Sequence, residues 1–121
     1  MLEPLQDAPA HALALKASGT IMAKDVESAI ATALGASDAS TGLVVVIDRD
    51  FDGYFAELAR GLKHASLAHK NLVKVAVVTE ADRMEEAKLS GFDAPAVPIR
   101  LFAANDRRAA YDWAAAARRG E

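Results

Sequence analysis

Residues 48–53 (DRDFDG) come closest to a chemical site in residue type and spacing. The pattern D-x-D-x-D-G matches the first half of an EF-hand calcium loop, where carboxylate oxygens bind the ion and a glycine permits the turn. The twelfth position of such a loop should be a bidentate Glu, and here it is Ala59. Asp48, Asp50 and Asp52 remain candidates for a looser divalent-cation site. The simpler interpretation is that these acids stabilise the start of the following helix, where the dipole favours negative charge.

Other catalytic patterns do not fit the chain. The same run resembles the D-x-D of phosphate-transferring hydrolases, but Phe51 and Asp52 stand where those enzymes need a small residue and a Thr. The sequence has no nucleophile elbow, no P-loop and no dinucleotide-binding G-x-G-x-x-G. Its three His residues lack zinc-binding spacing, and it has no Cys to serve as a nucleophile or ligand. We therefore predict no catalytic residues, no cofactor and no enzymatic activity.

Hydrophobic spacing predicts the elements that position these residues. Strands are expected at 1–5, 11–18, 43–47, 72–78 and 97–103, and helices at 22–34, 54–69, 80–90 and 105–119. The apolar runs LVVVI and LVKVAVV are typical of parallel strands buried on both faces. Pro98 cannot donate to a strand ladder, which places the last strand at a sheet edge. The order ββαβαβαβα predicts one α/β domain over residues 1–121, with a mostly parallel sheet and an antiparallel edge strand.

Polar side chains are predicted to gather where the parallel strands end. Ligands of open α/β sheets tend to bind beyond the carboxyl ends of the strands. In this chain that region holds Asp48, Asp50, Asp52, Thr79, Glu80 and Asp82. Thr79 followed by Asp82 also resembles a capping box for the third helix.

Composition excludes several classes of function. The 121 residues carry a net charge of -3, whereas a general nucleic-acid binder needs a basic face. No apolar run approaches the roughly 20 residues of a membrane span. The first residues, MLEPLQDAP, lack the basic start and apolar stretch of a secretory signal. We expect a cytoplasmic protein that binds no nucleic acid and has no membrane span.

Several motifs, taken in order, resemble the SpoIIAA-like proteins, a STAS-type family of small bacterial proteins of unknown function. The motifs are residues 17–20 (ASGT), 50–53 (DFDG), 61–64 (GLKH), 75–78 (VAVV) and 100–102 (RLF), the last before a helix that ends near Trp113. The chain departs from the family where the third helix begins, because the family often has a Trp there and this chain reads ADRM. The resemblance implies a STAS-like fold, no established enzyme activity, and homodimers. It also implies a binding role for Lys63 and His64, which recur in the family.

STAS antagonists are switched by a phosphorylated Ser at the start of the helix after the central strand. Between Asp48 and Leu62 this chain has no Ser or Thr, so that switch has no acceptor here. We therefore expect a non-enzymatic binding or regulatory module that acts through protein–protein interaction. Its expected interaction surface is the loop 48–53 with the helix 54–69.

Two alternative functions remain open from the sequence. The third helix has a thin apolar face, which is compatible with a lid over an apolar pocket beneath the second and third helices, and hence with a carrier of an apolar or lipid-like molecule. A metal-dependent enzyme at the loop from Asp48 to Asp52 is the other alternative. Leu67, with Tyr54 and Leu89, is a further candidate for a partner surface.

Overall fold

The computed structural model describes residues 2–5, 12–35, 41–52, 55–88 and 98–116. Its elements are, in chain order, β1 (Leu2–Pro4), β2 (Ala12–Ala17), α1 (Ala23–Leu34), β3 (Thr41–Ile47), α2 (Phe55–Ala68), β4 (Leu72–Thr79), α3 (Met84–Lys88), β5 (Ile99–Ala103) and α4 (Arg107–Ala115). Two 3₁₀ turns, η1 (Ala81–Arg83) and η2 (Ala104–Asp106), lead into α3 and α4. The predicted order ββαβαβαβα and the α/β fold class are therefore confirmed. In the described ranges, no helix is both long and apolar enough to cross a membrane.

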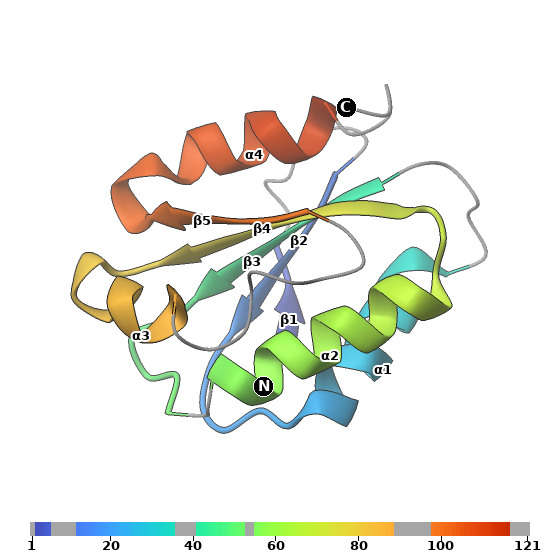
Figure 1. The fold of residues 1–121 in the computed structure, drawn as a ribbon, viewed down its shortest axis with the longest axis horizontal. Coiled ribbons are helices and arrows are strands. Elements are labelled where there is room, and N and C mark those ends of the chain that lie inside the picture. The colour runs from blue at the N-terminus through green and yellow to red at the C-terminus, as the bar shows by residue number, and fades with distance from the viewer. Residues whose placement is uncertain (1, 6–11, 36–40, 53–54, 89–97, 117–121) are drawn as a thin grey trace.

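The five strands form one mixed sheet in the order β1-β2-β3-β4-β5 (Figure 1). β1 runs antiparallel to β2, and the other three pairings are parallel. The two apolar runs lie side by side in the same direction, as predicted, with Val45 opposite Val77. β5 lies at the edge of the sheet, in agreement with the position of Pro98 just before it.

Helices cover both faces of the sheet, with α1 and α2 on one side and α4 on the other (Figure 1). The first face builds the larger core, in which Leu43 and Val75 of the strands meet Leu58 of α2. On the second face, Ala110 and Ala114 of α4 lie in one buried cluster with strand residues. A fully buried Val or Leu contributes about 1.5–3 kcal/mol. The large residues of the strands, α1 and α2 therefore supply most of the burial energy, while the small alanines let α4 approach closely.

Two glycines permit close approach of the helices. A Cβ built on Gly61 of α2 would lie 2.5 Å from Cβ of Val26 and 2.7 Å from the carbonyl oxygen of Ala23, both in α1. A Cβ on Gly42 of β3 would overlap the carbonyl oxygen of Ala114 in α4. Any larger residue at either position would push a helix away from its neighbour.

The starts of the third and fourth helices differ from the sequence predictions. The sequence predicts Thr79 as the cap of the third helix, but Thr79 ends β4 and Glu80 is the N-cap of η1, without a side-chain cap bond. The sequence predicts a final helix from residue 105, but Asn105 lies inside η2 and α4 begins at Arg107. In both cases a 3₁₀ turn forms the first turn, and apolar spacing does not distinguish such a turn from α-helix.

Lys74 is a charged residue inside a core strand. It is only 3% exposed, and its Nζ lies 4.6 Å from the centroid of the Trp113 ring in α4. A cation over an indole face gains about 0.5–2 kcal/mol. Its aliphatic stem also packs as an apolar side chain does. These two effects explain how a strand predicted to be buried accommodates a lysine.

We expect Gly61→Ala to lower the free energy of unfolding by about 1–3 kcal/mol, as overpacking does elsewhere. In an open helix the same change stabilises by up to about 1 kcal/mol, because Ala is the better helix former. Here the added methyl group meets Val26 and the backbone of Ala23. Urea denaturation followed by circular dichroism measures the difference.

The matched control is Lys63→Ala at an exposed position of the same helix, which we expect to change stability by less than about 0.5 kcal/mol. A Gly61→Ala variant as stable as the parent protein would contradict the close contact between α1 and α2.

Candidate functional site

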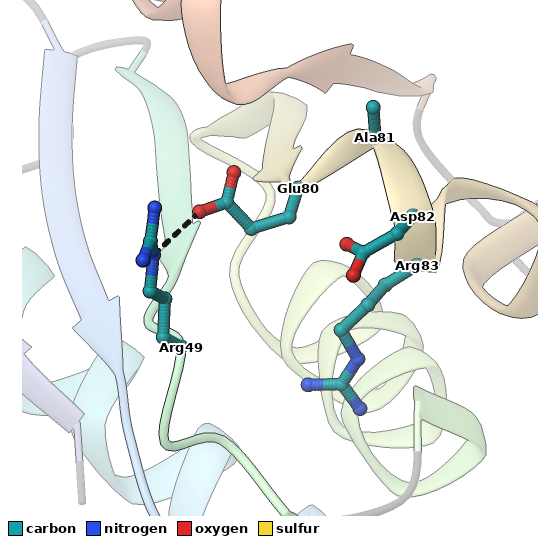
Figure 2. A pocket seen from close by; sticks show the side chains of 5 residues that line it. All are labelled: Arg49, Glu80, Ala81, Asp82 and Arg83. Atoms are coloured by element: carbon teal, nitrogen blue, oxygen red, sulfur yellow. Dashed lines mark hydrogen bonds and ion pairs between the residues drawn. The ribbon is translucent and has the colours of Figure 1, made fainter.

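The carboxyl ends of β3 and β4 lie next to each other because the two strands are parallel. The loop after β3 carries Asp48 and Asp50, and the segment after β4 carries Glu80 and Asp82. We call these four residues the acidic edge. An open groove of about 540 Å³ lies here, lined by Arg49, Glu80, Ala81, Asp82 and Arg83 (Figure 2).

Backbone hydrogen bonds fix the loop after β3. The N–H of Asp48 donates to the carbonyl oxygen of Ala17 at 2.8 Å, and the N–H of Asp52 donates to that of Gly19 at 3.1 Å. The N–H of Phe51 donates back to the carbonyl oxygen of Asp48 at 3.1 Å, which closes a turn. Gly19 has a φ of 65°, a conformation that glycine adopts without steric cost. The loop is therefore held against the segment that follows β2.

Arg83 ties the turn after β4 to the loop after β3. Its Nη1 donates to the carbonyl oxygen of Phe51 at 2.7 Å. Its Cζ lies 5.3 Å from the ring centroid of Phe51 and 4.9 Å from that of Phe55. The side chain is only 23% exposed, so water weakens these cation–π contacts little. Figure 2 shows Arg83 directed away from Arg49 and Glu80.

Arg49 and Glu80 form an ion pair between the two segments (Figure 2). Nε of Arg49 lies 3.1 Å from Oε1 of Glu80, and the Arg49 side chain is 89% exposed. Such an exposed pair contributes at most about 1 kcal/mol. By contrast, the side chains of Asp48, Asp50 and Asp82 make no hydrogen bond or ion pair within the described part of the chain. The acidic edge thus has three carboxylates without an internal partner.

Asp52 is engaged elsewhere, at the entry to α1. Its Oδ1 accepts a hydrogen bond from Oγ1 of Thr20 at 2.6 Å. Among the described residues, no group of three His, Cys, Asp or Glu side chains could hold a metal ion. The divalent-cation site predicted at Asp48, Asp50 and Asp52 gains no support from this arrangement and stays a prediction from the sequence.

Thr79 lies beneath the acidic edge. The residue is 0% exposed, and in the ranges that the structure describes its Oγ1 has no hydrogen-bond partner. A buried hydroxyl without a partner costs about 1–3 kcal/mol. Because the hydroxyl is enclosed, a macromolecule at the surface would not touch it.

Lys63 and His64 lie on the exposed side of α2, about two turns beyond its start. Nδ1 of His64 is 3.1 Å from Oε2 of Glu27, so this residue links α2 to α1. Leu67, one turn further along, is 61% exposed. The structure therefore does not group Lys63 and His64 with the acidic edge. Tyr54 and Leu89, the other candidates for a partner surface, lie outside the described residues.

Glu57 and Arg83 have structural roles that the sequence analysis missed. Oε1 of Glu57 accepts a hydrogen bond from the N–H of Ala23 at 3.0 Å, which satisfies a free donor at the start of α1. Oε2 of Glu57 also lies 3.3 Å from Nη1 of Arg60. Helical spacing identifies the polar face of α2, but it does not show which neighbouring helix start that face meets. The same limit hides Arg83, whose partners Phe51 and Phe55 come from the loop after β3 and from α2.

Comparison with known protein families gives one result that bears on the whole fold. The family model described as SpoIIAA-like matches residues 12–115. This range runs from the start of β2 to the end of α4 and includes the acidic edge. No curated protein and no solved structure matches the chain.

We expect Arg83→Ala to lower the free energy of unfolding by about 1–3 kcal/mol, since the loop loses a charged hydrogen bond and two cation–π contacts. The amides of residues 48–52 should also exchange faster with solvent deuterium. Urea denaturation and hydrogen-exchange mass spectrometry measure these two effects.

Arg49→Ala is the matched control, because it removes an arginine from the same groove but breaks only an exposed ion pair. We expect it to change stability by less than about 1 kcal/mol. Equal effects of the two substitutions would show that Arg83 does not fix the loop.

Proposed function

The chain belongs to the SpoIIAA-like family, and from this premise we propose that it is a non-enzymatic binding and regulatory module that acts through protein–protein interaction. The resemblance drawn from the sequence motifs is confirmed by the family match. We propose the acidic edge as the docking surface, and a partner protein that presents a basic surface to it.

The observation that carries this proposal is the set of unpaired carboxylates at the acidic edge. Asp50 and Asp82 are exposed and Asp48 is half-buried, and the loop that carries Asp48 and Asp50 is fixed by backbone hydrogen bonds. A surface that is already ordered loses little conformational entropy when a partner binds. Negative charge also speeds the approach of a basic partner and repels an acidic one.

The groove at this edge supports binding better than catalysis. The residues that the structure describes in its lining include no Ser, Thr, Cys, His or Lys. Nucleophilic catalysis needs a nucleophile and a base within hydrogen-bonding reach of each other. The arginines of the lining are already engaged, Arg49 by Glu80 and Arg83 by Phe51.

We propose that the negative charge of this surface is permanent. The phosphorylated Ser of STAS antagonists has no counterpart here, since no Ser or Thr lies between Asp48 and Leu62. A phosphate group would add a charge of about -1.5 to -2. The aspartates of the acidic edge supply a comparable charge without a kinase, so binding would be controlled by the supply of the partner.

The test uses the double variant Asp50→Lys/Asp82→Lys as an affinity bait in extracts of the organism that encodes the protein. We expect the parent protein to retain a specific partner, and the variant to bind it at least about tenfold more weakly at low salt. Added salt should reduce the difference, because it screens exposed charges.

The control bait is Glu3→Lys/Asp112→Lys, which changes the net charge equally at exposed positions away from the acidic edge. It should retain the partner. Equal retention by all three baits would contradict a docking role for the acidic edge.

An apolar groove favours a second candidate function, the carriage of an apolar or lipid-like small molecule. The groove has about 540 Å³, which lies within the usual range of small-molecule pockets. It is lined by Leu2, Pro4, Leu13, Leu15, Ser28, Ala29, Thr32 and Ala33, between α1 and the β1–β2 edge of the sheet. The sequence predicts such a pocket beneath the second and third helices instead. In the structure, Phe55, Leu58 and Leu62 of α2 are fully buried in the core.

Native mass spectrometry tests the carrier function. If the protein is a carrier, the parent should co-purify with a stoichiometric apolar molecule, and Ala33→Trp should lose it because the indole fills the groove. Ala31→Trp, at an exposed position of the same helix outside the groove, should keep it. An empty parent protein would rule out the carrier function.

A further inference from the structure

In the described part of the chain, β5 has a strand partner along one of its two edges. Within the described residues it pairs with β4 alone. The N–H of Val75 donates to the carbonyl oxygen of Pro98, so that carbonyl faces β4. Carbonyl directions alternate along a strand, and the polar backbone groups of Ile99 and Leu101 therefore face outward. Such groups are a template for an additional strand.

The outer edge of β5 forms the floor of a groove. This groove has about 510 Å³, and its lining includes Met84 and Lys88 of α3, Arg100 and Leu101 of β5, Asp106 of η2 and Ala109 of α4. Leu101 packs with the core on the α1–α2 face, whereas Phe102 packs with the cluster under α4. Leu101 and Phe102 face opposite sides of the sheet, yet both line this groove. The groove therefore runs along the edge of β5. Figure 1 shows α3 and α4 on either side of β5.

The walls of this groove decide what can occupy it. A second copy of the chain would bring its own β5 between its own α3 and α4. The walls of the two copies would then face each other across two strands that must approach to the roughly 4.8 Å spacing of a sheet. A single extended segment has no such walls and can reach the floor. The shape therefore favours a peptide segment over a second copy.

The charges of the groove indicate the chemistry of that segment. Arg100 is exposed, stacks over Phe102 with its Cζ 5.2 Å from the ring centroid, and has no carboxylate partner within the described residues. Lys88 lies on the α3 wall, and among the described residues it pairs with Glu85 alone, in an exposed pair at 3.8 Å. Asp106 is the acidic side chain of the lining. An acidic side chain opposite Arg100 and apolar side chains opposite Leu101 and Met84 would match this pattern.

We propose that the groove along β5 binds an extended segment of a partner protein as a sixth strand, with acidic residues on the side of Arg100 alternating with apolar residues on the side of Leu101. This surface is distinct from the acidic edge and has the opposite charge preference. The proposal therefore goes beyond the function proposed above and does not depend on it.

The test uses short peptides with blocked ends as probes. One alternates Glu with Val, a second alternates Lys with Val, and a third has the Glu–Val sequence with every backbone nitrogen methylated. We expect the Glu–Val peptide to bind saturably and to shift the amide NMR signals of Ile99 and Leu101. The methylated peptide keeps the side chains but cannot donate backbone hydrogen bonds, and it should not bind.

Arg100→Glu should weaken binding of the Glu–Val peptide by about tenfold, since an attractive cross-strand pair becomes repulsive. The same variant should prefer the Lys–Val peptide. Lys70→Glu makes the same change of charge at an exposed position just after α2 and should leave both affinities unchanged.

Three results would overturn the proposal. The first is absence of saturable binding, and the second is equal binding of the methylated peptide. The third is a protein dimer, detected by sedimentation, that Arg100→Glu dissociates, since a second copy would then occupy the edge.

Discussion

The parallel pairing of β3 with β4 is the constraint on which the rest of this structure depends. Parallel neighbours end at the same edge of a sheet, so the loop after β3 and the turn after β4 must share a surface. Asp50 and Asp82 are far apart in the sequence and lie at the same edge of the sheet only for this reason. Arg83 then fixes the two segments to each other. Its side chain, in the turn after β4, donates a hydrogen bond to the carbonyl oxygen of Phe51 in the loop after β3. An antiparallel pairing would place these residues at opposite ends of the sheet.

The elements that the sequence predicted well are those whose own residues determine their structure. Continuous runs of Val, Leu and Ile are suited to a strand covered on both faces, and the α2 pattern repeats its apolar residues with helical spacing. The features that the sequence did not predict depend on residues from another element. Lys74 is buried because Trp113 of α4 covers it, and Glu57 bonds the start of α1. Thr79 continues β4 instead of capping a helix, because its backbone stays paired with β5 through Ala103.

The same distinction applies to the candidate site. The sequence placed the acidic residues at one edge through the rule for parallel strands, and the structure has them there. It did not separate Asp52 from the others, because the hydrogen bond from Thr20 crosses between two loops. Nor did it identify the grooves beside β1 and β5, since each depends on how the side chains of consecutive elements pack against one another in three dimensions. Together these features give a scaffold with an acidic surface at one end, an apolar groove beside α1 and, among the described strands, an outer edge at β5.

The most direct test of the central claim, that a partner docks at the acidic edge, is site-specific photo-crosslinking in living cells. A benzophenone amino acid replaces Asp50 or Asp82 in turn, and Asp112, exposed on α4, serves as the reference position. The account predicts that both edge positions crosslink to the same protein and that the reference position does not. Absence of an adduct from both edge positions, or an equal yield from position 112, would contradict it.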